Sequence, residues 1–315
     1  MHYRPHIRIF STRHPTFYFL IAVLCLGSLG SCTKKLKLKY GISDIKQVVV
    51  ANLTPGAYLK VNISKSKQPD DFNPVEFLSN CKVDLYEDSI FKETMTYKLK
   101  DTLSGLGFYT SSFKLEPGKT YRIVSSHPEL GIAEATEYLP PLPSLYDVFL
   151  YDHADSINTH TTGRYTITFR DSAEADNYYY ISTFYQILKP VKDSVGDTTY
   201  VNDYIFIIPS YTSEFPNPSG YGRLFFTDQT FNGQVKKMEI TFPSQYNNIY
   251  KEIYLIVELS NTGKNFYTWN VQQIPVGQNF LNDGQMERSN IKSNIINGYG
   301  HFTANSSVYT GIKVK

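Results

Sequence analysis

The sequence stretch that decides the fold class is Gln47–Ile63, which reads QVVVANLTPGAYLKVNI. Its first part, Gln47–Leu53, is an apolar run typical of a buried strand, and Thr54-Pro55-Gly56 is typical of a turn. Proline suits the first central position of such a turn and glycine suits the second. Tyr58–Ile63 then alternates polar or aromatic residues with aliphatic ones, which is the period of a half-buried strand. The stretch therefore predicts two strands joined by a tight turn.

Further short strands are predicted up to residue 125. Turn signals such as Glu87-Asp88-Ser89 and Glu116-Pro117-Gly118-Lys119 separate them, and no segment between residues 40 and 140 has the apolar period of a helix. This pattern is typical of a β-sandwich. We therefore expect an Ig-like β-sandwich over residues 44–139. Its strands are expected at Gln47–Leu53, Tyr58–Ile63, Lys82–Tyr86, Phe91–Leu99, Gly107–Phe113 and Thr120–Ser125.

A proline-rich stretch at residues 140–145 breaks the strand pattern. Its prolines cannot donate to a sheet and favour an extended connection. We therefore expect a linker here and a second β-sandwich domain over residues 146–315, in which Gln186–Tyr221 is largely irregular because it holds four prolines. The strands expected in this half are Ser144–Tyr151, Gly163–Arg170, Asn177–Leu188, Tyr204–Ile208, Gly222–Phe226, Val235–Phe242, Ile253–Leu259, Ile291–Ile296, His301–Ala304 and Val308–Val314.

One helix is expected in the second domain, near residues 263–273. Ser260-Asn261-Thr262 can cap its start, and Phe266, Trp269 and Gln273 would then lie along one face. The fold class expected from the sequence is thus all-β, with two β-sandwich domains in tandem.

The first 31 residues have the features of a secretion signal. Three arginines precede residue 14, and Phe17–Leu29 is an apolar run too short to span a bilayer as a helix. The run ends in Leu29-Gly30-Ser31-Cys32, which resembles the lipobox of bacterial lipoproteins. That resemblance implies removal of residues 1–31, acylation of Cys32 with palmitate-type chains, and a lipidated tether over residues 32–43. The alternative is an ordinary signal peptide that happens to contain a cysteine.

Charge and cysteine content narrow the function classes. The formal net charge is +2, and the three arginines of the signal leave a remainder near −1, so a nucleic-acid partner is not expected. Once Cys25 and Cys32 are assigned to the signal and the lipid anchor, Cys81 is the single cysteine that remains. A disulfide within the chain is then excluded, and stability must come from a packed core. No second long apolar run occurs in the sequence.

Several stretches match one family in their order along the chain. They are Val48–Ala51, Tyr58–Ser64, Cys81–Tyr86, Gly107–Tyr109, Pro117–Tyr121, Leu139–Leu145, Asn177–Tyr179, Phe226–Gly233 and Asn294–Phe302. Together with the lipobox, they resemble the outer-membrane lipoproteins of Bacteroidota-type bacteria that are grouped as domain-of-unknown-function family four-two-four-nine. The resemblance covers nearly all of the chain after residue 31.

Members of that family are commonly encoded beside TonB-dependent outer-membrane receptors. The resemblance therefore implies a lipid-anchored, non-enzymatic accessory or ligand-capture partner of such a receptor, acting in the uptake of a small-molecule or oligomeric nutrient. Surface-displayed lipoproteins of these bacteria usually carry acidic residues after the lipidated cysteine, whereas Thr33-Lys34-Lys35 is basic. The sequence therefore leaves open whether the protein lies on the cell surface or on the periplasmic face of the outer membrane. The alternative function is a structural or adhesive envelope protein with Ig-like binding domains.

The sequence contains no recognisable catalytic or metal-binding motif. It has no nucleophile elbow, phosphate loop, zinc-protease helix or paired cysteine site. We therefore expect no enzyme, no cofactor and no metal site. Asp152, His153, Asp155 and His160 lie close in sequence and offer ligand atoms, but their spacing matches no metal motif, and a polar loop explains them equally well.

Aromatic residues are the preferred candidates for ligand contact. On a strand, Tyr178, Tyr180 and Phe184 share one face, which can be an exposed aromatic platform for a sugar or a partner, although a sandwich strand can also be covered on both faces. Binding residues tend to lie on loops over a rigid scaffold. The aromatic residues of the expected irregular segment are therefore added to the set, and these are Tyr200, Tyr204, Tyr211, Phe215 and Tyr221.

A tripeptide of Asp, then Ser or Thr, then an apolar residue or Thr occurs six times. It resembles the acceptor site of the O-glycosylation system found in the same bacteria. The alternative is that Asp-Ser and Asp-Thr simply open turns, which they do well. The candidate acceptor residues, all expected to lie between strands, are Ser89, Thr102, Ser156, Ser172, Ser194 and Thr198.

Overall fold

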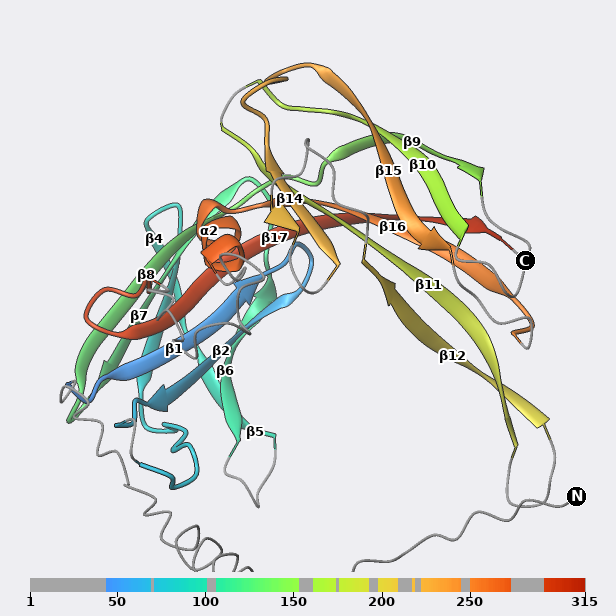
Figure 1. The fold of residues 1–315 in the computed structure, drawn as a ribbon. Helices are drawn as coiled ribbons and strands as arrows, with labels where there is room; N and C mark the ends of the chain where they lie inside the picture. Colours follow the sequence, from blue (N-terminus) through green and yellow to red (C-terminus); the bar gives the residue numbers. More distant parts are fainter. Residues whose placement is uncertain are drawn as a thin grey trace, which may run out of the picture. The chain divides into compact units, whose positions relative to one another are not determined.

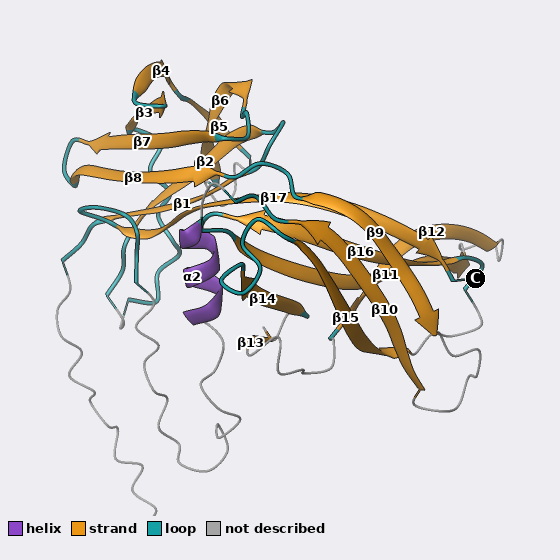
Figure 2. Cartoon of the chain, turned by 90° about the horizontal axis from the view of Figure 1, so that it is seen from above, coloured by secondary structure: helices purple, strands orange, loops and turns teal. Residues whose placement is uncertain are grey.

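The structure is a computed structural model of the chain. It describes residues 44–68, 71–100, 106–152, 161–173, 176–192, 198–208, 217–218, 222–244, 250–272 and 292–314. All of these residues belong to one compact unit, Ser43–Lys315. Strands dominate the described part of the chain, which holds a single helix (Figures 1 and 2). The expected all-β fold is confirmed.

The first half of the unit is a sandwich of two sheet layers. Strands β1, β2, β6 and β5 form one layer, and β4, β3, β7 and β8 form the other. The turn between β1 and β2 has the expected geometry, because Gly56 has φ +71° and the Ala57 amide donates to the Thr54 carbonyl at 3.2 Å. The bounds are β1 Gln47–Leu53, β2 Tyr58–Lys65, β3 Lys82–Glu87, β4 Ile90–Thr94, β5 Thr96–Leu99, β6 Gly107–Lys114, β7 Lys119–His127 and β8 Gly131–Leu139.

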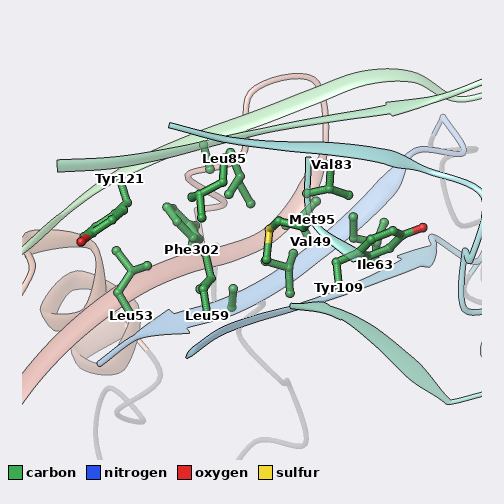
Figure 3. Close-up of a cluster of buried hydrophobic side chains, with 14 of the residues drawn as sticks. Val49, Leu53, Leu59, Ile63, Val83, Leu85, Met95, Tyr109, Tyr121 and Phe302 are labelled. Carbon is green, nitrogen blue, oxygen red and sulfur yellow. The ribbon is translucent and has the colours of Figure 1, made fainter. Parts of the chain in front are cut away.

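Side chains from both layers meet in a first hydrophobic core (Figure 3). Leu53 and Leu59 come from one layer and Leu85 and Tyr121 from the other, and all four are buried. Phe302, from the far end of the chain, is buried in the same core. This core is therefore incomplete without the C-terminal strand.

The second half is another sandwich. Strands β15, β10 and β9 form one layer, and β14, β11, β16 and β17 lie in the other, with a second hydrophobic core between them. The bounds are β9 Ser144–Asp152, β10 Thr161–Arg170, β11 Tyr178–Lys192, β12 Thr198–Ile207, β13 Asn217–Pro218, β14 Arg223–Thr227, β15 Val235–Ser244, β16 Ile253–Thr262, α2 Lys264–Gln272 and β17 Tyr299–Lys313.

Strand β17 belongs to both sandwiches. Its first part pairs in parallel with β1, from Tyr299 opposite Val48 to Ala304 opposite Leu53, and its last part pairs antiparallel with β16. One ten-stranded sheet results, in the order β13-β14-β11-β16-β17-β1-β2-β6-β5 with β12 paired to β11. Phe302 fills the first core and Val308 packs against the second. The two sandwiches thus share a strand.

Several predicted strands need correction. Gln186–Tyr221 is not largely irregular, because β11 runs on to Lys192 and pairs with β12 over ten residue pairs. Pro190 is tolerated within β11 for a simple reason. The Leu188 amide points to the β16 side, where it donates to the Glu252 carbonyl. The backbone nitrogen of Pro190 faces the same side, where pairing with β16 has already ended at Ile187. Its missing amide hydrogen therefore breaks no hydrogen bond with β16.

Two further predictions at the C-terminal end were wrong. The predicted strand Ile291–Ile296 is irregular in its described part, apart from one bridge between Ile296 and Glu134. The predicted strands His301–Ala304 and Val308–Val314 are one strand, β17. Strand β8 was missed altogether, although its residues alternate in burial.

The expected helix is present as α2, but its predicted cap is not. Ser260-Asn261-Thr262 is the end of β16, where the Thr262 hydroxyl donates to the Tyr178 carbonyl at 3.2 Å. The helix begins after Gly263, whose carbonyl accepts the Tyr267 amide. The residues that the capping pattern assigns to the start of the helix therefore lie in β16, where they pair with β11. Within the described ranges, no helix is long and apolar enough to cross a membrane.

Candidate functional site

Strand β11 presents different side chains to its two faces. Tyr179, Ile181 and Tyr185 point into the second core. Tyr178, Tyr180 and Phe184 lie on the opposite face, which we call the outer face of the ten-stranded sheet, because residues at even spacing share one side of a strand.

Helix α2 lies against this outer face (Figure 2). The Tyr267 ring lies 5.1 Å from that of Tyr178, and Phe266 is stacked on Tyr180 at 5.7 Å with an interplanar angle of 20°. As a result Tyr180 is only 2% exposed. The platform expected from the three aromatic residues is therefore covered at Tyr178 and Tyr180, and it opens only toward Phe184.

A hollow of about 530 Å³ lies on the outer face where this cover ends. We call it the outer-face pocket. Its volume falls within the range of small-molecule sites. Its lining residues come from six strands and from α2, and they are Asn52, Tyr180, Phe184, Tyr204, Phe206, Arg223, Glu258, Phe266, Asn305 and Tyr309.

Aromatic rings line the side of the pocket next to β12. The Phe184 ring lies 5.8 Å from both Tyr204 and Phe206, edge-on to the first and tilted to the second. Tyr204 is 53% exposed and Phe206 is 68% exposed. Neither ring is needed to fill a core, so both are available to a ligand.

A carboxylate surrounded by hydroxyl groups lies at the bottom of the pocket. Glu258 is buried, and its Oε1 accepts hydrogen bonds from Tyr180 at 2.6 Å, Ser307 at 2.8 Å and Tyr309 at 3.0 Å. Burial, together with this carboxylate, raises the pKa of both tyrosines. The phenol groups therefore stay protonated and keep donating to Glu258.

The remaining polar groups lie at the rim. The guanidinium carbon of Arg223 is 5.0 Å from the centre of the Tyr180 ring. Asn52 of β1 donates to Asn305 of β17 at 2.7 Å and accepts from Thr303 at 3.0 Å. Because β1 belongs to the first sandwich and β11 to the second, the pocket forms only where β17 joins the two.

This chemistry suits binding. Glu258 is hydrogen-bonded to two phenols and a serine hydroxyl, and none of the described lining residues is a histidine or a cysteine. Across the described residues, no group of three or more His, Cys, Asp or Glu side chains is placed to hold a metal ion. Aromatic faces with a few fixed polar groups are typical of sites that recognise a ligand by shape and hydrogen bonding.

The structure brings three of the eight predicted contact residues together, namely Tyr180, Phe184 and Tyr204. Tyr178 lies beneath α2, and Tyr200 is exposed on β12 but does not line the pocket. Tyr211, Phe215 and Tyr221 lie outside the described residues. Phe206 was not among the predicted contact residues, although the predicted strand Tyr204–Ile208 already places it on the same face as Tyr204.

The other predicted sites are only partly covered by the structure. Ser89, Ser172 and Thr198 are exposed, as a glycan would require, although Thr198 begins β12 and does not lie between strands as expected. Cys32, Thr102, Ser156, Ser194 and the side chains of Asp152, His153, Asp155 and His160 lie outside the described residues.

Two of the aspartates in the tripeptides have structural roles. Asp88 accepts the Thr120 amide at 3.0 Å beside Lys119, and these two interactions lower its pKa. Asp171 is buried and accepts the Tyr179 hydroxyl at 2.6 Å and the Gly233 amide at 2.7 Å. These hydrogen bonds thus explain why an aspartate occurs at the two positions, without any role in glycosylation.

The stretches that resembled a family also have structural roles. The Asp228 carboxylate accepts the Asn177 amide at 2.9 Å, which ties the end of β14 to the start of β11. The Asn294 side chain accepts the Phe302 amide at 2.9 Å and donates to its carbonyl at 2.6 Å, which fixes the turn before β17. These residues therefore maintain the fold around the pocket and do not line it.

Comparison with solved structures finds the adhesin InvE of Yersinia pseudotuberculosis, at 16% identity and a TM-score of 0.20. The match covers 70% of this chain and 58% of that one, so the chain spans less than two thirds of the adhesin's length. No argument rests on so low a TM-score. Comparison with curated proteins gives no match. The family model for the domain of unknown function DUF4249 matches residues 37–310, and the chain therefore belongs to the DUF4249 family.

Proposed function

We propose that this protein is a non-enzymatic outer-membrane lipoprotein that captures a ligand for a TonB-dependent receptor in nutrient uptake. The observation that carries this proposal is the outer-face pocket, with three aromatic rings on one side and hydrogen-bonded polar groups at its bottom and rim. The resemblance found in the sequence implies an accessory role of this kind. The arrangement of Glu258 among hydroxyl donors supports binding and offers no activated nucleophile.

The proposed anchor is the acylated Cys32, joined to β1 by a short tether. The described fold begins at residue 44. An extended chain spans at most about 3.5 Å per residue, so a tether of this length reaches roughly 40 Å. The sandwiches would therefore stay close to the membrane, on whichever face of it the anchor is inserted.

Affinity purification of the tagged lipoprotein from detergent-solubilised membranes tests the partnership. We expect a TonB-dependent receptor barrel to be enriched with it, and recovery without any such barrel would count against the proposal. Cys32→Ser is expected to move the protein out of the membrane fraction, because the acyl chains supply the anchor. Retention of this variant in the membrane would contradict the lipoprotein assignment.

O-glycosylation at the tripeptide sites is a further part of the proposal. Ser89, Ser172 and Thr198 are exposed and can carry a bulky hydrophilic group. The intact mass of the native protein is the test, because a mass equal to that of the polypeptide plus the lipid alone would exclude glycosylation. Peptide mapping would then show which of the sites carry the added mass.

A second candidate function is an adhesive envelope protein. Tyr146, Phe149 and Tyr151 of β9 are exposed by 56%, 54% and 45%, respectively. The Phe149 and Tyr151 rings lie 4.8 Å apart, and exposed apolar side chains away from the pocket can mark protein contacts. The gene neighbourhood separates the two candidates, because an adjacent receptor gene favours ligand capture.

A further inference from the structure

We propose that the outer-face pocket binds a short, neutral oligosaccharide. This inference rests on the proposed function and names the ligand class of the same site. Three features of the pocket carry it: its charge balance, its pairing of aromatic faces with hydroxyl groups, and the backbone of β11, which is already paired on both sides along the pocket.

The charge balance favours a neutral ligand. Among the described lining residues, the charged ones are Arg223 and Glu258, one of each sign. Glu258 already accepts three hydroxyl hydrogen bonds through Oε1. A charged ligand of either sign would be attracted by one of these side chains and repelled by the other, so the pocket gives no net electrostatic advantage to a charged ligand over a neutral one.

The aromatic rings match the apolar faces of a sugar ring. Phe184, Tyr204 and Phe206 are adjacent to one another on neighbouring strands, and the last two are more than half exposed. An aromatic face carries negative charge density that attracts the slightly positive C–H groups on one side of a pyranose. Stacking of this kind leaves the hydroxyl groups at the ring's edge free for hydrogen bonds.

Groups that meet those hydroxyls are placed next to the rings. The hydroxyl group of Tyr309, a residue that is 61% exposed, donates to Glu258, and its oxygen still has a lone pair that can accept. The amides of Asn52 and Asn305 at the rim both donate and accept. Sugar hydroxyls likewise do both, so this mixed set fits them better than it fits a ligand with acceptors only.

The floor of the pocket disfavours an extended peptide. Phe184 is paired with Phe206 on one side and with Ile256 on the other, and Tyr180 is paired with Phe225 and Ser260. The backbone of β11 is therefore already used by its neighbours along the pocket. A peptide bound as an added strand needs a free edge, which β11 does not offer along the pocket.

The test uses the detergent-solubilised lipoprotein on an array that displays neutral glycans, acidic glycans and peptides. Isothermal titration then follows with the best neutral glycan in solution. We expect binding to a neutral glycan, weakened roughly threefold to tenfold by either Tyr204→Ala or Phe206→Ala and more by the double variant. Both side chains are largely exposed, so the variants are expected to fold.

Tyr200→Ala is the matched control. Tyr200 is an exposed tyrosine of the same strand that does not line the pocket, and its replacement is expected to leave the affinity unchanged. A neutral glycan that binds the double variant as tightly as the wild type would overturn the assignment to this pocket. Binding of only peptides or acidic glycans, lost in the double variant, would overturn the ligand class while leaving ligand capture intact. Binding of no probe at all would overturn the inference. The proposed function would then be tested separately, by co-purification with a receptor.

Discussion

At the scale of single residues, Glu137 connects the first sandwich to helix α2. It lies on β8, is only 4% exposed, and accepts a hydrogen bond from the side chain of Asn265 in the first turn of α2. Gly263 makes this approach possible, because a Cβ there would lie 1.9 Å from Glu137 Oε1. Burial raises the pKa of Glu137 to about 7, despite the opposing effect of the hydrogen bonds from Asn265.

The first prediction concerns Glu137→Gln. A carboxyl whose pKa is raised in the folded state stabilises the fold below its unfolded pKa, near 4.5, and loses this contribution as the pH rises toward 7. We expect the free energy of unfolding of the wild type to fall over this range by at most about 3 kcal/mol, and Glu137→Gln to flatten the profile. Urea denaturation at a series of pH values measures this, and identical profiles for both proteins would contradict it.

The second prediction concerns Gly300, which has φ +107° and lies against β1. A Cβ at this position would be 2.1 Å from the Val49 carbonyl oxygen, so Gly300→Ala must move β17 away from β1. We expect a loss of more than about 1 kcal/mol in the free energy of unfolding. Gly56→Ala is the control, because Gly56 also has positive φ but open space around it. Equal losses for the two variants would show that the close approach to Val49 is unimportant.

At the scale of elements, α2 is held on the sheet mainly by aromatic rings. Phe266 packs on Tyr180 and Phe225, and Trp269 lies 4.4 Å from the His301 ring. Trp269 is the single tryptophan of the sequence, so its fluorescence reports on this helix alone.

The third prediction is that Phe266→Ala loosens α2. Losing a half-buried ring is expected to cost about 2 kcal/mol of stability and to shift Trp269 emission to longer wavelength, because the indole becomes more hydrated. Thermal melts followed by fluorescence measure both effects. Lys264→Ala, at the exposed start of the same helix, is the control and is expected to change neither. Unchanged emission in Phe266→Ala would contradict this account of the packing.

The elements also show what the sequence can predict. Local patterns were sufficient for β1, its turn and β2, because alternation and turn residues agree there. They predicted only the second part of β12, as Tyr204–Ile208, because nearby prolines suggested a loop before it, although Pro190 faces a side of β11 where the described pairing with β16 has already ended. The alternation of Tyr178, Tyr180 and Phe184 was correct, but the cover over Tyr180 comes from α2, some 85 residues on. No local pattern contains that contact.

At the scale of the whole molecule, β17 makes the two sandwiches depend on each other. The sequence suggested tandem domains with a linker at residues 140–145. The structure pairs β17 with β1 in one half and with β16 in the other. Parallel pairing between the first and last described strands is non-local, and no turn signal announces it, so the sequence pattern could not predict it.

The fourth prediction follows from this shared strand. A fragment of residues 44–139 lacks Phe302 and Ala304 from its core and leaves an edge of β1 unpaired. Deleting a buried phenylalanine alone costs roughly 3–5 kcal/mol, a large part of a typical domain's stability. We expect this fragment to be unfolded by NMR, and the same fragment with residues 292–306 attached to be folded. A dispersed spectrum from residues 44–139 alone would contradict it.

The central claim is the proposal that the outer-face pocket captures a ligand for nutrient uptake. Growth of a deletion strain on its natural nutrient mixture tests this most directly, when the strain is complemented with wild type, Tyr200→Ala or the Tyr204→Ala/Phe206→Ala double variant. The account predicts that wild type and Tyr200→Ala restore growth equally, while the double variant fails despite reaching the outer membrane in the same amount. Full growth with the double variant would contradict it.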